Sequence, residues 1–134
     1  MEFAIIRTDK KIPHLWKMES FHRVLPTDTG NFLLHYIIYP NGTVFVWVAD
    51  NKEISFDDFH VAVPDKFGSL PALSTRLGET DSRGRFTALR LSKRLGVQAV
   101  VSWSIDQNDE TSRLIENEIL KDILQNRPHA PVLV

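Results

Sequence analysis

The sequence predicts a single α+β domain in which a mainly antiparallel β-sheet carries two α-helices packed on one face. Three observations predict this class: an apolar strand pair around Asn41-Gly42, an alternating strand at 97–105, and a helical period on each side of that strand. The 134 residues, 43% hydrophobic and 25% charged, match one globular domain. We therefore expect one domain over 1–126 and an extended tail over 127–134, where two prolines accompany no periodic pattern.

A β-hairpin is the clearest local element. Two runs rich in β-branched and aromatic residues, 32–39 and 44–48, flank Asn41-Gly42, whose tolerance of positive φ suits a tight turn. Side chains alternate between the two faces of a strand, so the second run presents one apolar set on each face. These sets are Val44, Val46 and Val48 on one face, and Phe45 and Trp47 on the other. Both faces of the hairpin therefore require a cover.

Further strands have weaker patterns. Residues 59–63 read as a strand that Pro64 ends, and the segment 15–25 contains another. The stretch 64–84 is rich in Pro, Gly, Asp and Ser, which predicts turns with one short strand near Leu73.

The second half of the chain begins with a helix. Apolar residues at spacings of three and four predict it over 85–95, with Gly96 placed to end it. This phase puts Phe86 on the packed face. Alternation then predicts the strand at 97–105, packed chiefly on one side.

A second helix follows. Either Asn108 or Asp109 can cap it, and it runs to about Gln125. Its apolar stripe consists of Leu114, Ile115, Ile119, Ile123 and Leu124. Two such amphipathic helices are enough to cover one face of the sheet.

Charge and composition exclude several classes of protein. Sixteen basic and seventeen acidic residues give a net charge of -1, so no overall field attracts nucleic acid or an anionic membrane. The absence of cysteine excludes disulfides and thiolate chemistry. The start of the chain lacks a signal-peptide core, and no stretch approaches the ~20 apolar residues of a spanning helix. We expect an intracellular protein of the cytoplasm, with the nucleus left open as a second compartment.

Catalytic groupings are missing from the sequence. No two of the five histidines have the spacing of a metal pair, and no nucleotide-binding or nucleophile-elbow motif occurs, so we predict no metal, no cofactor and no catalytic residue. His35 and His60 lie in predicted strands and could meet across the sheet. They leave open one alternative, an enzyme or ligand-binding domain for a small molecule. We interpret Asp57-Asp58 as a solvated entry to a strand.

A local basic segment stands out from this balanced charge. Between residues 83 and 94 the chain has no acidic residue and five basic ones: Arg83, Arg85, Arg90, Lys93 and Arg94. One interpretation is a solvated helix face. The other is a docking surface for an acidic patch of a partner protein.

The doubly apolar hairpin has a similar pair of interpretations. Nothing left in the sequence covers the second face of the sheet, and an uncovered face would form a large apolar patch. A partner is one cover, and a sheet that curls and closes on itself is the other. We therefore expect the second face to serve in dimerisation, through either of the two apolar sets at 44–48.

A series of segments over 31–124 carries a resemblance to a known family: the basic helix, together with Leu34-His35-Tyr36, Phe45-Val46-Trp47-Val48, Leu70-Pro71-Ala72-Leu73-Ser74-Thr75, Leu77-Gly78-Glu79-Thr80, Gln98-Ala99-Val100-Val101-Ser102-Trp103 and Ile115-Glu116-Asn117. In the order of these segments, the chain resembles the proteasome assembly chaperone 4 family. The resemblance implies a non-enzymatic chaperone that pairs through its sheet with a proteasome assembly chaperone 3 counterpart. It also implies that the pair binds α subunits while the α ring of the 20S proteasome forms.

Two alternatives remain beside this resemblance. The isolated chain can form a homodimer through the same sheet face. An adaptor of another intracellular complex would have the same layered architecture and differ only in its partner.

Overall fold

One sheet organises the protein. The structure, a computed structural model, describes residues 3–7, 18–52, 55–56, 58–65, 70–79 and 82–126. Within these residues seven strands form the sheet in the order β1-β2-β3-β4-β7-β5-β6. The strands are β1 (Phe3–Arg7), β2 (Glu19–Thr27), β3 (Gly30–Ile38), β4 (Val44–Asp50), β5 (Phe59–Val63), β6 (Ala72–Leu77) and β7 (Ala99–Ser104).

Almost every neighbouring pair of strands is antiparallel. The exception lies at the centre, where β4 and β7 run parallel with Val46 opposite Val101. This parallel pair joins the meander β1 to β4 to the smaller group β5, β6 and β7. The predicted mainly antiparallel α+β fold is therefore confirmed.

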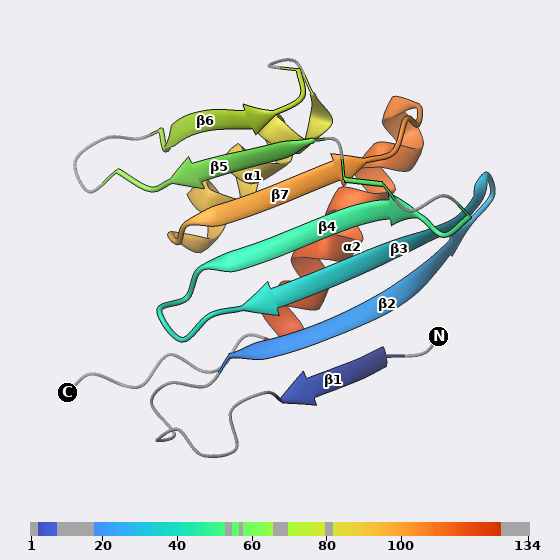
Figure 1. The fold of residues 1–134 in the computed structure, drawn as a ribbon, viewed down its shortest axis with the longest axis horizontal. Helices are drawn as coiled ribbons and strands as arrows, with labels where there is room; N and C mark the ends of the chain where they lie inside the picture. Colours follow the sequence, from blue (N-terminus) through green and yellow to red (C-terminus); the bar gives the residue numbers. More distant parts are fainter. Residues whose placement is uncertain are drawn as a thin grey trace.

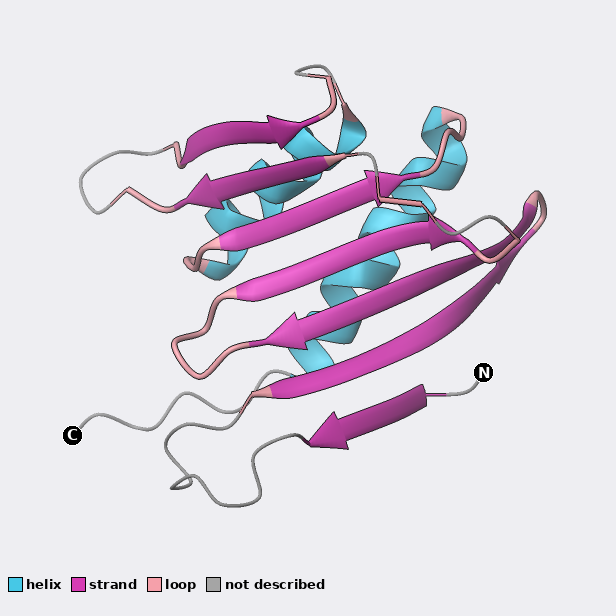
Figure 2. Ribbon diagram, viewed as in Figure 1, coloured by secondary structure: helices cyan, strands magenta, loops and turns pink. Residues whose placement is uncertain are grey.

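Both helices, α1 (Arg83–Leu95) and α2 (Asp109–Asn126), lie behind the sheet in the view of Figure 1. Figure 2 shows the same two layers, with α1 behind β5 and β7 and α2 behind the meander. We call the covered side the helix face and the other side the open face. The strand register aligns Phe21, Tyr36, Val46, Val101 and His60 on the helix face. These side chains are fully buried, which places the core between the sheet and the helices.

The predicted hairpin joins β3 to β4, but its turn is longer than a two-residue loop. Tyr39 O accepts from Gly42 N at 2.9 Å, so Pro40 and Asn41 are the central residues of a β-turn. Within this turn only Gly42, at φ 91°, has a positive φ, and the Asn41 side chain accepts from Thr43 N at 3.0 Å. Asn41 therefore acts through its amide oxygen and not through a left-handed backbone.

Helix α1 begins two residues before the predicted start because Ser82 caps it. The Ser82 hydroxyl accepts from Gly84 N at 3.1 Å, and Gly96 ends the helix with φ 68°. Helix α2 has its cap at Asn108, whose side chain accepts from Thr111 N at 2.8 Å. This contact decides between the two predicted caps.

Helix α2 is fixed to the sheet by a buried polar network. Asp122 accepts from Arg23 of β2 at 2.6 Å and from the Tyr36 hydroxyl of β3 at 2.7 Å. Arg23 also pairs with Glu118 at 3.0 Å. Burial, together with the charge and hydrogen bond of Asp122, raises the pKa of Tyr36 far above its ordinary value, so the phenol remains a donor.

Several predictions about packing need correction. Phe86 is 41% exposed, because Gly84, Thr87, Ala88 and Leu91 form the packed side of α1. Leu114 and Leu124 are exposed as well, and the buried stripe of α2 reduces to Ile115, Ile119 and Ile123. In α1 the small residues Gly84 and Thr87 thus lie at the contact where the apolar pattern had placed Phe86.

At the edges of the sheet, one strand was not predicted and the other was. The chain forms an edge strand at β1, a segment to which the sequence analysis assigned no strand. The short strand near Leu73 is present as β6, at the opposite edge. Among the described strands β1 and β6 are the two edges of the sheet and do not pair, so these strands do not close into a barrel. The predicted tail over 127–134 lies outside the described residues.

The network around Asp122 predicts a large stability change. Replacing Asp122 by Ala leaves the buried Arg23 guanidinium without its closest carboxylate, which we expect to lower the free energy of unfolding by about 3–5 kcal/mol. Urea unfolding followed by circular dichroism measures this change in the free energy of unfolding. Lys121→Ala, at the exposed neighbouring position of α2, is the matched control and should change it by less than about 0.5 kcal/mol. Equal effects of the two substitutions would contradict the anchoring role of Asp122.

Candidate functional site: the open sheet face and the helical surface

The open face carries an aromatic cluster, defined as Phe45, Trp47, Phe56 and Phe59. Phe45 and Trp47 point away from the helices, because Val46 between them points into the core. Phe56 meets the Trp47 ring edge-on at 5.9 Å between centroids and lies 5.7 Å from Phe59. Trp47 Nε1 donates to Ser55 O at 3.0 Å, which holds this part of the β4–β5 connection against the sheet. Phe56 nevertheless remains 47% exposed.

The structure separates the two apolar sets predicted at 44–48. Val44, Val46 and Val48 are 2%, 0% and 0% exposed, because the helices cover them. They are core residues, so in the folded chain they are not accessible to a partner, and Phe45 and Trp47 are the accessible members of the predicted interface. Phe45 and Trp47 are only half-buried and lie on the face that neither α1 nor α2 covers.

Two histidines lie next to this cluster on the open face. His22 and His35 are register partners on β2 and β3, and their rings stack with centroids 6.4 Å apart. His35 is also opposite Trp47 of β4. Burial, and after it the charge of His22, lowers the pKa of His35 from its ordinary value.

His60 occupies a different environment, on the helix face. It is fully buried, its Nδ1 lies 3.1 Å from Thr75 Oγ1, and its Nε2 lies 2.8 Å from Asp58 Oδ1 at ion-pair distance without hydrogen-bond alignment. His35 and His60 are therefore on opposite faces of the sheet. They cannot act on one substrate, and the alternative that combines them is not supported.

The environment of Asp58 contradicts our interpretation of Asp57-Asp58 as a solvated entry to a strand. It is 7% exposed, accepts a hydrogen bond from the Ser82 hydroxyl, and accepts another from Trp103 N at 3.2 Å. A Cβ on Gly84 would come within 2.7 Å of Asp58 Oδ1, so only glycine permits this close approach of α1. Asp58 thus joins β5, β7 and the start of α1. Residue Asp57 lies outside the described residues.

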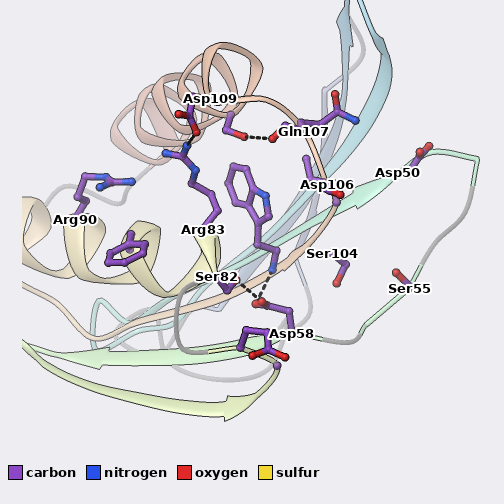
Figure 3. Close-up of a pocket in the computed structure, with 16 residues that line it drawn as sticks. Asp50, Ser55, Asp58, Ser82, Arg83, Arg90, Ser104, Asp106, Gln107 and Asp109 are labelled. Carbon is purple, nitrogen blue, oxygen red and sulfur yellow. Dashed lines mark hydrogen bonds and ion pairs between the residues drawn. The ribbon is translucent and has the colours of Figure 1, made fainter.

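A polar hollow of about 1070 Å³ opens above Asp58 (Figure 3). Figure 3 shows Ser82 bonded to Asp58 on one side and Arg83 paired with Asp109 on another. The lining includes neither His35 nor His60. Among the described residues, no three His, Asp or Glu side chains are grouped as metal ligands, and no helix is long and apolar enough to cross a membrane.

The basic segment divides into two parts. Arg83 pairs with Asp109 at 2.8 Å and Glu116 at 3.5 Å, and Arg90 Nε donates to Glu116 at 3.1 Å. These two arginines hold α1 against α2, and Arg85 is half-buried. Lys93 and Arg94 lie exposed in the last turn of α1, and no carboxylate of the described residues forms an ion pair with either.

Comparison with known proteins identifies this layered domain. The model of the family described as proteasome assembly chaperone 4 matches residues 31–105, which is more than half of the chain. The chain belongs to the proteasome assembly chaperone 4 family. This match spans β3 to β7 and confirms the resemblance seen in the sequence. No curated protein matches the chain.

A solved structure from yeast has the same fold as this family member. It is described as a novel chaperone complex for yeast 20S proteasome assembly, and it matches with a TM-score of 0.56 and 18% sequence identity. The alignment covers 81% of this chain and 93% of that chain. As a member of the proteasome assembly chaperone 4 family, the protein is a proteasome assembly chaperone, which implies a non-enzymatic role.

The lowered pKa of His35 predicts how this family member responds to acid. Because the folded-state pKa lies below 6.5, the unfolded chain binds more protons between the two values. The contribution of neutral His35 to the free energy of unfolding is therefore present above about pH 6.5. It is lost as the pH falls through the folded-state pKa.

The urea concentration at the unfolding midpoint should fall as the pH is lowered from about 7.5 to about 5.5. We expect it to fall less in His35→Gln than in the wild type. His22→Gln should reduce this fall by a smaller amount, because it removes only the repulsive charge and leaves the burial of His35. Parallel pH profiles for the wild type and His35→Gln would contradict the assignment.

Proposed function

We propose that the chain forms a heterodimer with a proteasome assembly chaperone 3 counterpart, and that the dimer binds α subunits during assembly of the α ring. The observation that carries this proposal is the open face with its aromatic cluster, on the side of the sheet that α1 and α2 leave uncovered. Partner-binding surfaces are enriched in Trp, Tyr and Phe, which supply large contact areas.

The open face offers further apolar area around the aromatic cluster. Val24 is 37% exposed and Val63 is 46% exposed, and both point to the open face. A contact over this sheet would remove these side chains from water, at roughly 25 cal/mol for each Å² of apolar surface. We propose that Phe45 and Trp47 lie at its centre, and that a second copy occupies this face when the counterpart is absent.

The α subunit is proposed to bind at the basic end of α1. Lys93 and Arg94 are exposed and form no ion pair with a described carboxylate, whereas Arg83 and Arg90 already pair with carboxylates of α2. Exposed cations without a partner attract an acidic surface at little desolvation cost. For the place of action we propose the cytoplasm, with the nucleus left open.

The sheet interface is tested by truncating the aromatic cluster. Phe45→Ala and Trp47→Ala should each weaken the dimer about thirtyfold, the equivalent of about 2 kcal/mol for a residue at the centre of an interface. Sedimentation velocity over a range of concentrations, with and without the chaperone 3 counterpart, measures the dissociation constant.

Leu114→Ala is the matched control for this experiment. It removes a 46% exposed apolar side chain from α2, on the opposite side of the molecule, and should leave dimerisation unchanged. A wild-type chain that stays monomeric at micromolar concentration, even with the counterpart present, would overturn the proposed interface.

The basic contact is tested by the double variant Lys93→Glu/Arg94→Glu. It should reduce capture of α subunits about tenfold at physiological salt while the dimer persists, because attraction becomes repulsion at two exposed positions. Pull-down with separate α subunits measures capture. Arg76→Glu, an exposed cation of the edge strand β6, is the control and should capture normally. Undiminished capture by the double variant would exclude this surface.

A further inference from the structure

A groove of about 790 Å³ runs between the outer sides of α1 and α2. On α1 it is lined at helical spacing by Arg83, Thr87, Arg90, Leu91 and Arg94, and on α2 by Arg113, Glu116, Asn117 and Leu120. Each set falls on a single helix face, at intervals of three and four residues. The groove is therefore a continuous feature of two helices and extends beyond the basic segment of α1.

The charged side chains that line this groove are almost all cationic. Its single acidic side chain, Glu116, accepts from the Thr87 hydroxyl at 2.6 Å and from Arg90 Nε at 3.1 Å, and it lies 3.5 Å from Arg83. These contacts use both oxygens of Glu116. Arg94 and Arg113 are exposed on opposite walls, and neither has an ion-pair partner among the described residues.

The floor of the groove is apolar. Leu91 is nearly buried, Leu120 is partly buried against the core, and both line the space between the cationic walls. An acidic ligand without apolar groups would leave the apolar surface of this floor exposed to solvent. A ligand that carries carboxylates and one or two apolar side chains would satisfy both the walls and the floor.

We infer that this groove binds an acidic peptide segment of the α subunit that inserts an apolar side chain between Leu91 and Leu120. The inference rests on the proposed function and deepens it, because it adds Arg113 and the two leucines to the contact and states the chemistry of the bound segment. Charge complementarity supports this inference, because the one carboxylate of the groove is already paired within the protein while five cations line it: Arg83, Arg90, Lys93, Arg94 and Arg113.

Binding of a synthetic peptide tests the inference. The probe is a short fluorescein-labelled peptide of Glu and Leu, and fluorescence polarisation measures its affinity for the full chain, alone and with the chaperone 3 counterpart. Arg94→Glu/Arg113→Glu should weaken binding about tenfold. Lys121→Glu, an exposed cation of α2 outside the groove, should bind like the wild type. Circular dichroism and urea unfolding confirm that the variants fold.

The peptide itself provides the second comparison. Replacing its Leu residues by Gln should weaken binding about tenfold at unchanged charge, because the apolar floor then loses its partner. Equal affinity of the two peptides, or of the wild type and Arg94→Glu/Arg113→Glu, would overturn the inference.

The outcome also separates the inference from the proposed function. If Lys93→Glu/Arg94→Glu loses α-subunit capture while the Glu and Leu peptide fails to bind, the basic contact stands and the groove does not. If capture persists in every variant while the peptide binds as expected, the groove takes acidic peptides but the proposed α-subunit contact fails.

Discussion

The buried contact of Asp122 with Arg23 and Tyr36 determines which side of the sheet is available to a partner. Asp122 lies on α2, whereas its two donors lie on β2 and β3, so the contact holds the helix against the meander. A charged group at such a site is costly unless it is paired, and each of the three side chains pairs with another. Because α2 is held on this face, the aromatic cluster remains on the other.

A second carboxylate of α2 has a comparable effect on the outer surface. Glu116 draws Arg83 and Arg90 into contacts between the helices, which converts part of a basic segment into packing. Lys93 and Arg94 at the end of α1 and Arg113 on α2 are exposed and form no ion pair among the described residues. The surface that an acidic partner would meet is therefore decided by one residue that lies outside the basic segment.

The sequence was sufficient for elements whose signals are local. The apolar runs around Pro40-Asn41-Gly42 and the two candidate caps Asn108 and Asp109 act over a few residues, and the structure contains the hairpin and a cap at Asn108. It was insufficient where the cause is distant in the chain. Asp122 and Arg23 are 99 residues apart, and Asp58 meets Trp103 across 45 residues, so no window of sequence shows either contact. Phe86 was misplaced for a related reason, because the close approach at Gly84 turns α1 toward its small side chains.

The two proposed surfaces lie on opposite sides of one layer pair. A chaperone partner on the open face would leave the groove of α1 and α2 accessible, since the sheet and its buried core separate them. Simultaneous binding thus requires no rearrangement of the fold. The surfaces also differ in physical character, because salt does not screen the contacts of an apolar aromatic cluster. Exposed Lys93, Arg94 and Arg113 act through a field that salt screens within about 10 Å. If the proposed contacts form, rising salt would release the α subunit before it separated the dimer, because only the second contact depends on exposed charge.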